Sequence, residues 1–211
     1  VQIGKNCGRN MTAVLTNMEE PLGFAVGNSL EVIEAINTLN GNGPKDLLEL
    51  CLEIGSYLVV DAGLAKSTAD AKVILNEQIN NKQALNKFAE LVEAQGGNKD
   101  WILDTELFPK ASEVKEVVST KSGYVHSIDA LAVGKSAMYL GAGREQITDI
   151  IDPAVGVVLS KKVGDKVSEG EVLARVYTNG RATDKCMSGV LEAYLIDEKE
   201  VFPNLILDVV R

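Results

Sequence analysis

The sequence predicts an α+β protein with a mainly helical first half and a second half rich in short strands. Across residues 28–94, apolar side chains recur at three- and four-residue spacing, which is typical of amphipathic helices. After Trp101 the pattern changes to short apolar runs separated by glycine-containing turns, which is typical of strands. The Pro-containing run 107–110 stands between the two patterns, because proline restricts its own backbone and that of the preceding residue. We therefore expect two domains, residues 1–111 and 112–211.

Capping and stop residues delimit the helices of the first half. Asn28 with Glu31 three positions later has the spacing of a capping box, and Ser67 with Asp70 has the same spacing. Pro44 suits the first turn of another helix. The apolar residues of that helix predict a central place in the core: Leu47, Leu50, Cys51, Ile54 and Leu58.

The N-terminal segment has weaker signals. Residues 1–4 read as the tail of a helix, which suggests a domain that begins before Val1. Residues 11–15 form a strand candidate, and residues 16–27 form a loop that precedes the helix at Asn28.

The second half alternates strands and turns. Residues 113–120 and 124–128 flank one turn, and residues 154–159 and 172–177 flank two others that contain Gly164 and Gly170. Residues 130–140 predict a helix, residues 182–196 a late helix, and residues 205–210 a terminal strand. Residues of the two paired runs should form a core of their own: Val155, Val157, Leu159, Val172, Leu173 and Val176.

Composition excludes several classes of partner. The net charge of −9 disfavours binding to nucleic acid or to an anionic membrane surface, and no apolar run reaches the length of a membrane span. Cys7, Cys51 and Cys186 form no C-x-x-C pair, which fits reduced thiols that mostly serve in packing. These features predict a cytoplasmic protein.

Several motifs together resemble those of the pyrimidine-nucleoside phosphorylases. They are residues 15–36, LTNMEEPLGFAVGNSLEVIEAI, residues 123–125, GYV, residues 138–144, MYLGAGR, and residues 151–159, IDPAVGVVL. The resemblance follows the family in order through nearly the whole chain. It implies the helical remainder of an α/β domain followed by a C-terminal α+β domain.

The resemblance also implies an activity for the intact enzyme. Phosphate would displace the base from a pyrimidine nucleoside to give (deoxy)ribose 1-phosphate, in a homodimer that needs no organic cofactor. The family's phosphate loop, K-x-S-T-G-G-V-G-D, and its Arg, Ser and Lys contacts to the base belong upstream of Val1. The resemblance therefore implies that this chain has no catalytic residues of its own and is inactive alone.

One metal site follows from the same resemblance. The family holds a potassium ion with two backbone carbonyls and a glutamate, which correspond here to Leu22, Ala25 and Glu34. Carbonyl oxygens in an irregular loop and one carboxylate suit a weakly hydrated monovalent cation. The alternative interpretation is that Glu34 is an ordinary residue on a solvated helix face and that the Pro-Leu-Gly turn merely enters a helix.

Other motifs favour structural interpretations. Residues 141–144, GAGR, follow a predicted helix and are typical of a helix stop rather than a phosphate loop. His126 is the single histidine and has no nucleophile pattern around it, which indicates a partly exposed strand residue.

A carrier module is the alternative function. Residues 161–170, KKVGDKVSEG, resemble the corners of biotinyl and lipoyl domains, which suggests a barrel-sandwich or β-hammerhead-like core. Such a module needs a modified lysine at an exposed hairpin tip, and Lys185 is the nearest candidate. Since Lys185 falls in the predicted late helix, we expect the scaffold without the carrier function.

Overall fold

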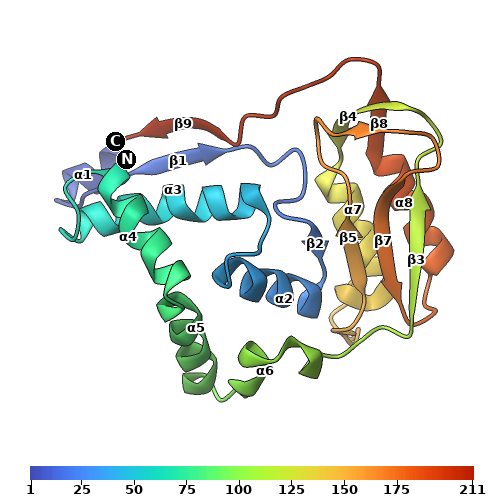
Figure 1. Ribbon diagram of the computed structural model, residues 1–211, viewed down its shortest axis with the longest axis horizontal. Coiled ribbons are helices and arrows are strands. Elements are labelled where there is room, and N and C mark those ends of the chain that lie inside the picture. Colours follow the sequence, from blue (N-terminus) through green and yellow to red (C-terminus); the bar gives the residue numbers. More distant parts are fainter. The chain divides into compact units, whose positions relative to one another are not determined.

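The computed structural model describes residues 1–211 as two compact units (Figure 1). Unit 1 comprises Val1–Asn17, Ile36–Leu103 and Asn204–Arg211, and unit 2 comprises Met18–Ala35 and Asp104–Pro203. Helices make up 43% of the chain and strands 19%, in several small sheets, which confirms the α+β class.

The units are discontinuous, whereas the sequence predicts a single boundary between residues 111 and 112. Met18–Ala35 groups with the second half of the chain, and Asn204–Arg211 groups with the first. Each crossing segment contributes a strand to its unit. Pairing between strands so far apart in sequence leaves no trace in local composition.

Unit 1 is mainly helical. Its one sheet pairs β1 (Ala13–Thr16) antiparallel with β9 (Ile206–Val210), which run side by side in Figure 1. The predicted strands at 11–15 and 205–210 are thereby confirmed. The helices of this unit are α1 (Gln2–Asn6), α3 (Lys45–Asp61), α4 (Thr68–Asn80), α5 (Gln83–Ala94) and α6 (Asp100–Leu103). Of these, the sequence did not predict α6.

Local signals place the helix ends well. Ser67 caps α4, because its Oγ accepts a hydrogen bond from the Asp70 amide at 3.1 Å. Pro44 is the N-cap of α3, directly before its first residue. Helix α2 (Asn28–Leu39) begins in unit 2 and continues into unit 1, and Gly41 follows its end with a φ of +84°.

The predicted central burial of α3 is wrong. Ile54 is 41% exposed and Leu58 is 67% exposed, and Ser56 is the buried residue of the helix. Helix α4 packs along α3, where Lys72 forms an ion pair with Glu53. A helix with apolar residues on more than one side needs more than one packing partner, so the remaining apolar side chains stay exposed.

Unit 2 contains two antiparallel sheets. The four-stranded sheet has the order β2-β5-β7-β3, formed by β2 (Ala25–Val26), β5 (Gly156–Leu159), β7 (Val172–Thr178) and β3 (Glu113–Val118). The three-stranded sheet has the order β6-β4-β8, formed by β6 (Lys166–Val167), β4 (Gly123–Ile128) and β8 (Tyr194–Asp197). A short 3-10 turn, η1 (Thr105–Leu107), precedes them.

The strands expected on either side of residues 121–123 are present as β3 and β4, and they lie in different sheets. Ser119 extends the pairing of β3 by donating to Glu171 O at 2.8 Å. One expectation in this region needs correction. The predicted late helix is α8 (Thr183–Ala193), and its last expected residues form β8 instead. There Tyr194 pairs with Ile128, so sheet pairing overrides the helical pattern.

The core of unit 2 lies between its sheets and two helices. Helix α7 (Ala130–Ala137) continues as one π-helical turn, η2 (Met138–Ala142), and packs against α8. The predicted core residues are buried except Val172, which is partly buried. The helices add further buried residues to this core: Val133, Ala137, Leu140, Cys186 and Val190.

Candidate functional site

The loop that enters β2 carries the predicted cation site, and Glu34 reaches back to it from α2. Glu34 Oε1 accepts hydrogen bonds from the amides of Phe24 at 2.9 Å and Ala25 at 3.1 Å. A Cβ added at Gly23 would lie 2.2 Å from Glu34 Oε2, so the second carboxylate oxygen lies against the same loop. Glu34 is therefore not an ordinary solvated helix residue, because the loop folds around its carboxylate.

The helix start beside this loop is fixed by a second carboxylate. Glu31 Oε1 accepts from the Gly27 amide at 2.9 Å, which supplies the glutamate half of the expected capping box one position earlier than predicted. The Asn28 side chain does not complete that box, because its Nδ2 donates to Ala142 O at 2.7 Å. These contacts place α2 so that Glu34 faces the loop.

Lys162, which the sequence did not indicate as a site residue, contacts this loop from the turn that follows β5. Lys162 Nζ donates to Gly23 O at 2.9 Å and to Pro21 O, and it lies 3.6 Å from Glu20 Oε2. The next amide, from Val163, donates to Glu20 Oε2 at 2.9 Å. The sequence had placed Lys162 only at a corner between strands, because its partners lie about 140 residues away.

The donor set fits a monovalent cation in chemical type. Leu22 and Ala25 would offer carbonyl oxygens and Glu34 a carboxylate, and hard cations prefer oxygen ligands. The Ala25 amide donates to Glu34, so Ala25 and the carboxylate are neighbours, with Leu22 in the same short loop. No cluster of three or more His, Cys, Asp or Glu side chains forms a metal site elsewhere in residues 1–211.

The glycines of the GAGR run end a helix, in agreement with the structural interpretation. Gly141 has a φ of +108°, and its carbonyl accepts from the Asp152 amide at 2.9 Å. Arg144 is exposed. The pKa of nearby Asp149 is lowered chiefly by hydrogen bonds from the amides of Gln146 and Glu145, with weaker contributions from arginines.

A pocket of about 220 Å³ lies beside this run, within unit 2. It is lined by Val26, Gly27, Asn28, Glu31, Gly134, Ala137, Met138, Ala142 and Gly143. The one ionisable group in the lining is the Glu31 carboxylate, which already caps the start of α2. The pocket therefore lacks a pair of groups for acid–base chemistry.

The single histidine has the structural position expected of it. His126 is partly buried in β4, at a register shift where Val125 pairs with Ile196 and Ser127 with Leu195. Its Nδ1 is buried without a hydrogen-bond partner. The ring therefore lacks the second group that would orient it as a catalytic base.

The cysteines only partly match the expectation of packing roles. Cys186 is buried in α8, and burial raises the pKa of its thiol to about 12. Cys7 and Cys51 are exposed, so the packing interpretation is wrong for both. Cys7 follows the last residue of the short helix α1, and Cys51 lies within α3.

Lys185 does not have the setting of a carrier lysine. It lies in α8, and its Nζ is 3.4 Å from the centroid of the Tyr139 ring. A cation–π contact within a helix pair holds the ammonium on the surface of the domain, whereas a carrier lysine projects from a hairpin tip.

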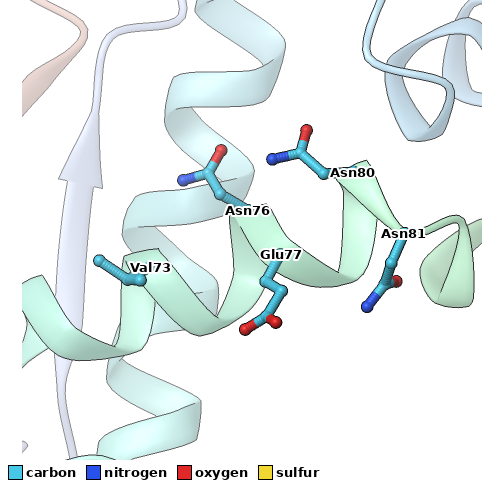
Figure 2. A pocket seen from close by; sticks show the side chains of 5 residues that line it. All are labelled: Val73, Asn76, Glu77, Asn80 and Asn81. Carbon is cyan, nitrogen blue, oxygen red and sulfur yellow. The ribbon is translucent and has the colours of Figure 1, made fainter.

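A surface hollow lies in unit 1 along α4. It measures about 610 Å³ and is lined by Val73, Asn76, Glu77, Asn80 and Asn81. Figure 2 shows that all five side chains come from α4 and the residue after it, with Asn76 and Asn80 on one side and Glu77 on the other. Side chains that diverge from one helix and include one carboxylate offer no convergent groups for catalysis.

Comparison with known proteins supports the resemblance to the pyrimidine-nucleoside phosphorylases. Residues 124–197 match the family model described as the pyrimidine nucleoside phosphorylase C-terminal domain. The whole chain corresponds to a C-terminal portion of the pyrimidine-nucleoside phosphorylases. It is 44% identical, over 206 residues, to pyrimidine-nucleoside phosphorylases of Staphylococcus aureus strain USA300 and Staphylococcus haemolyticus strain JCSC1435.

The matched region is nearly all of this chain and about half of each relative. It covers 98% of the 211 residues and 48% of the length of these curated pyrimidine-nucleoside phosphorylases. The resemblance inferred from the loop, the GAGR run and the β5 segment is thereby confirmed. No helix of the structure is long and apolar enough to cross a membrane.

Proposed function

We propose that this chain is the C-terminal part of an enzyme that phosphorolyses pyrimidine nucleosides. Its substrates would be phosphate and a pyrimidine nucleoside, and its products the free base and a (deoxy)ribose 1-phosphate. The observation that supports this most is identity of 44% across 98% of the chain to pyrimidine-nucleoside phosphorylases. We further propose that the intact enzyme is a cytoplasmic homodimer.

The chemistry requires groups that these 211 residues do not contain. Phosphorolysis needs a cradle for the attacking phosphate and donors that stabilise charge on the departing base. No K-x-S-T-G-G-V-G-D run occurs in the sequence. The catalytic groups would therefore come from the region of the intact enzyme that corresponds to the unmatched half of the relatives.

The chain's own contribution would be structural, together with one cation site. In this proposal Leu22, Ala25 and Glu34 hold a potassium ion together with ligands from the remainder of the enzyme. A bound cation would supply fixed positive charge beside the phosphate region. The hydrogen bonds from Phe24 and Ala25 to Glu34 support this role, since they fix the carboxylate at the loop.

The experiment is an assay of phosphorolysis with uridine and thymidine in the presence of phosphate. The intact protein should release base, and the purified 211-residue chain should not exceed the uncatalysed background. Loss of both the phosphate cradle and the base contacts should remove many orders of magnitude in rate. Turnover by the pure chain would contradict the proposal that the catalytic groups lie outside these 211 residues. Inactivity of the intact protein would contradict the proposed phosphorolysis itself.

A further inference from the structure

The ammonium group of Lys162 contacts three oxygen atoms of the loop at residues 20–25. Its side chain is 12% exposed, and that of Glu20 is 17% exposed. An ammonium group carries three donors, and it finds two carbonyls and a carboxylate here. A charge so far removed from water is retained only where such partners compensate its lost hydration.

Three carbonyl groups of the loop accept hydrogen bonds from the segment at residues 159–162. The carbonyls of Pro21 and Gly23 accept from Lys162, and the carbonyl of Phe24 accepts from the Leu159 amide at 2.8 Å. In the run from Pro21 to Ala25, the carbonyls of Leu22 and Ala25 take no part in these three contacts. These are the two carbonyls that the proposed cation site requires.

The amide groups of the same run complete the arrangement. Those of Phe24 and Ala25 donate to Glu34, so the loop is held on one side by a carboxylate and on the other by an ammonium group. Peptide planes have little freedom once neighbouring carbonyls and amides are bound. Fixing Pro21 and Gly23 thus restricts how the intervening Leu22 carbonyl is directed.

We infer that Lys162 is a positioning residue for a monovalent-cation site formed by Leu22, Ala25 and Glu34. This inference rests on the cation site of the proposed function. Lys162 itself binds no substrate and no cation. It holds two carbonyls of the loop so that the other two remain available to the ion, and it balances the charge of Glu20.

The neighbouring lysine provides a matched control. Lys161 is also mostly buried, with 19% of its side chain exposed, and it pairs with Glu171 and donates to Lys166 O at 3.0 Å. Neither of those partners belongs to the loop at residues 20–25. Lys161→Met and Lys162→Met therefore remove the same charge at adjacent positions, and only the second removes contacts to the loop.

The test measures how potassium stabilises the intact protein. Thermal unfolding is followed while potassium chloride replaces choline chloride at constant ionic strength, and hydrogen exchange is measured at the amides of Phe24 and Ala25. For Lys162→Met, the half-saturating potassium concentration should rise roughly 10- to 100-fold, as expected for loss of a group that orients metal ligands. Exchange at both amides should also quicken, whereas Lys161→Met should leave both readouts near wild type.

Further variants make the outcome decisive. If Lys162→Met does not fold, Lys162→Gln is measured against Lys161→Gln, and Lys162→Arg should restore much of the potassium response because it keeps the charge. Equal half-saturation in the Lys161 and Lys162 variants would overturn the inference while leaving the cation site intact. A wild-type protein without a potassium-specific response would overturn both the site and the role of Lys162.

Discussion

Replacing Glu34 by alanine should destabilise unit 2 more than removing any single surface carboxylate. The substitution leaves the amides of Phe24 and Ala25 without their acceptor in a part-buried loop. Hydrogen bonds to a charged group contribute about 1.5–3 kcal/mol each, and partial access of water to the loop reduces that figure. We expect a total loss of about 2–4 kcal/mol in the free energy of unfolding of unit 2.

Two further variants separate charge from hydrogen bonding. Glu34→Gln keeps a carbonyl oxygen that accepts both amides, so it should cost about 1–2 kcal/mol, which reflects neutral in place of charge-assisted bonds. Glu31→Ala, on the same helix, removes the acceptor of only the Gly27 amide and should cost about 1 kcal/mol, as loss of a helix cap does. The expected order of stability is therefore wild type, then Glu31→Ala or Glu34→Gln, then Glu34→Ala.

The measurement must follow unit 2 separately from unit 1. The single tryptophan, Trp101, belongs to unit 1, so its fluorescence does not report the unfolding of unit 2. Hydrogen exchange at amides of β5 and β7 gives the free energy of opening of the four-stranded sheet. If Glu34→Ala shows the same exchange as wild type, or if Glu31→Ala costs as much, the carboxylate does not hold the loop as we argue.

Two other predictions concern single residues. Gly23→Ala should lower the free energy of unfolding more than Gly170→Ala. Both positions have a positive φ, of +69° and +82°, but the new methyl group meets Glu34 Oε2 at Gly23 and nothing within 4 Å at Gly170. Equal decreases in the denaturant midpoint would show that the Glu34 side chain moves aside at no cost. In the folded 211-residue chain, Cys7 and Cys51 should react with a thiol reagent at about pH 8 and Cys186 should not, since its pKa of about 12 leaves it protonated and it is buried. Counting thiols before and after denaturation checks this, and three rapid thiols in the native chain would contradict the burial of Cys186.

The features that the sequence predicted correctly depend on neighbours within a few residues. The cap formed by Ser67 and Asp70 is an interaction over three positions, so its spacing alone identifies it. The β5 and β7 strands follow from apolar runs between glycine turns, and the structure pairs them antiparallel. The family was recognised for a similar reason, because its motifs are contiguous runs.

The features that the sequence did not predict depend on distant partners. The pairing of β1 with β9 joins the two ends of the chain, and that of β2 with β5 brings residues near 25 to residues near 158. The strands in these pairings are only two to five residues long. The β propensity of so short a strand does not indicate which other strand it pairs with. The discontinuous units follow from these two pairings.

Lys162 shows how the same limit applies to a candidate site. From sequence it is one of two adjacent lysines at a polar turn, and a solvated corner is the usual place for such residues. Only the fold distinguishes them, since Lys161 turns to Glu171 and Lys162 turns to the loop at residues 20–25. The pairing of β2 with β5 carries that loop to the end of β5, where the turn with both lysines begins. The contact between Lys162 and the loop is therefore a consequence of sheet topology. If the proposed cation site exists, a change that breaks the β2–β5 pairing should weaken potassium binding even with Leu22, Ala25 and Glu34 unchanged.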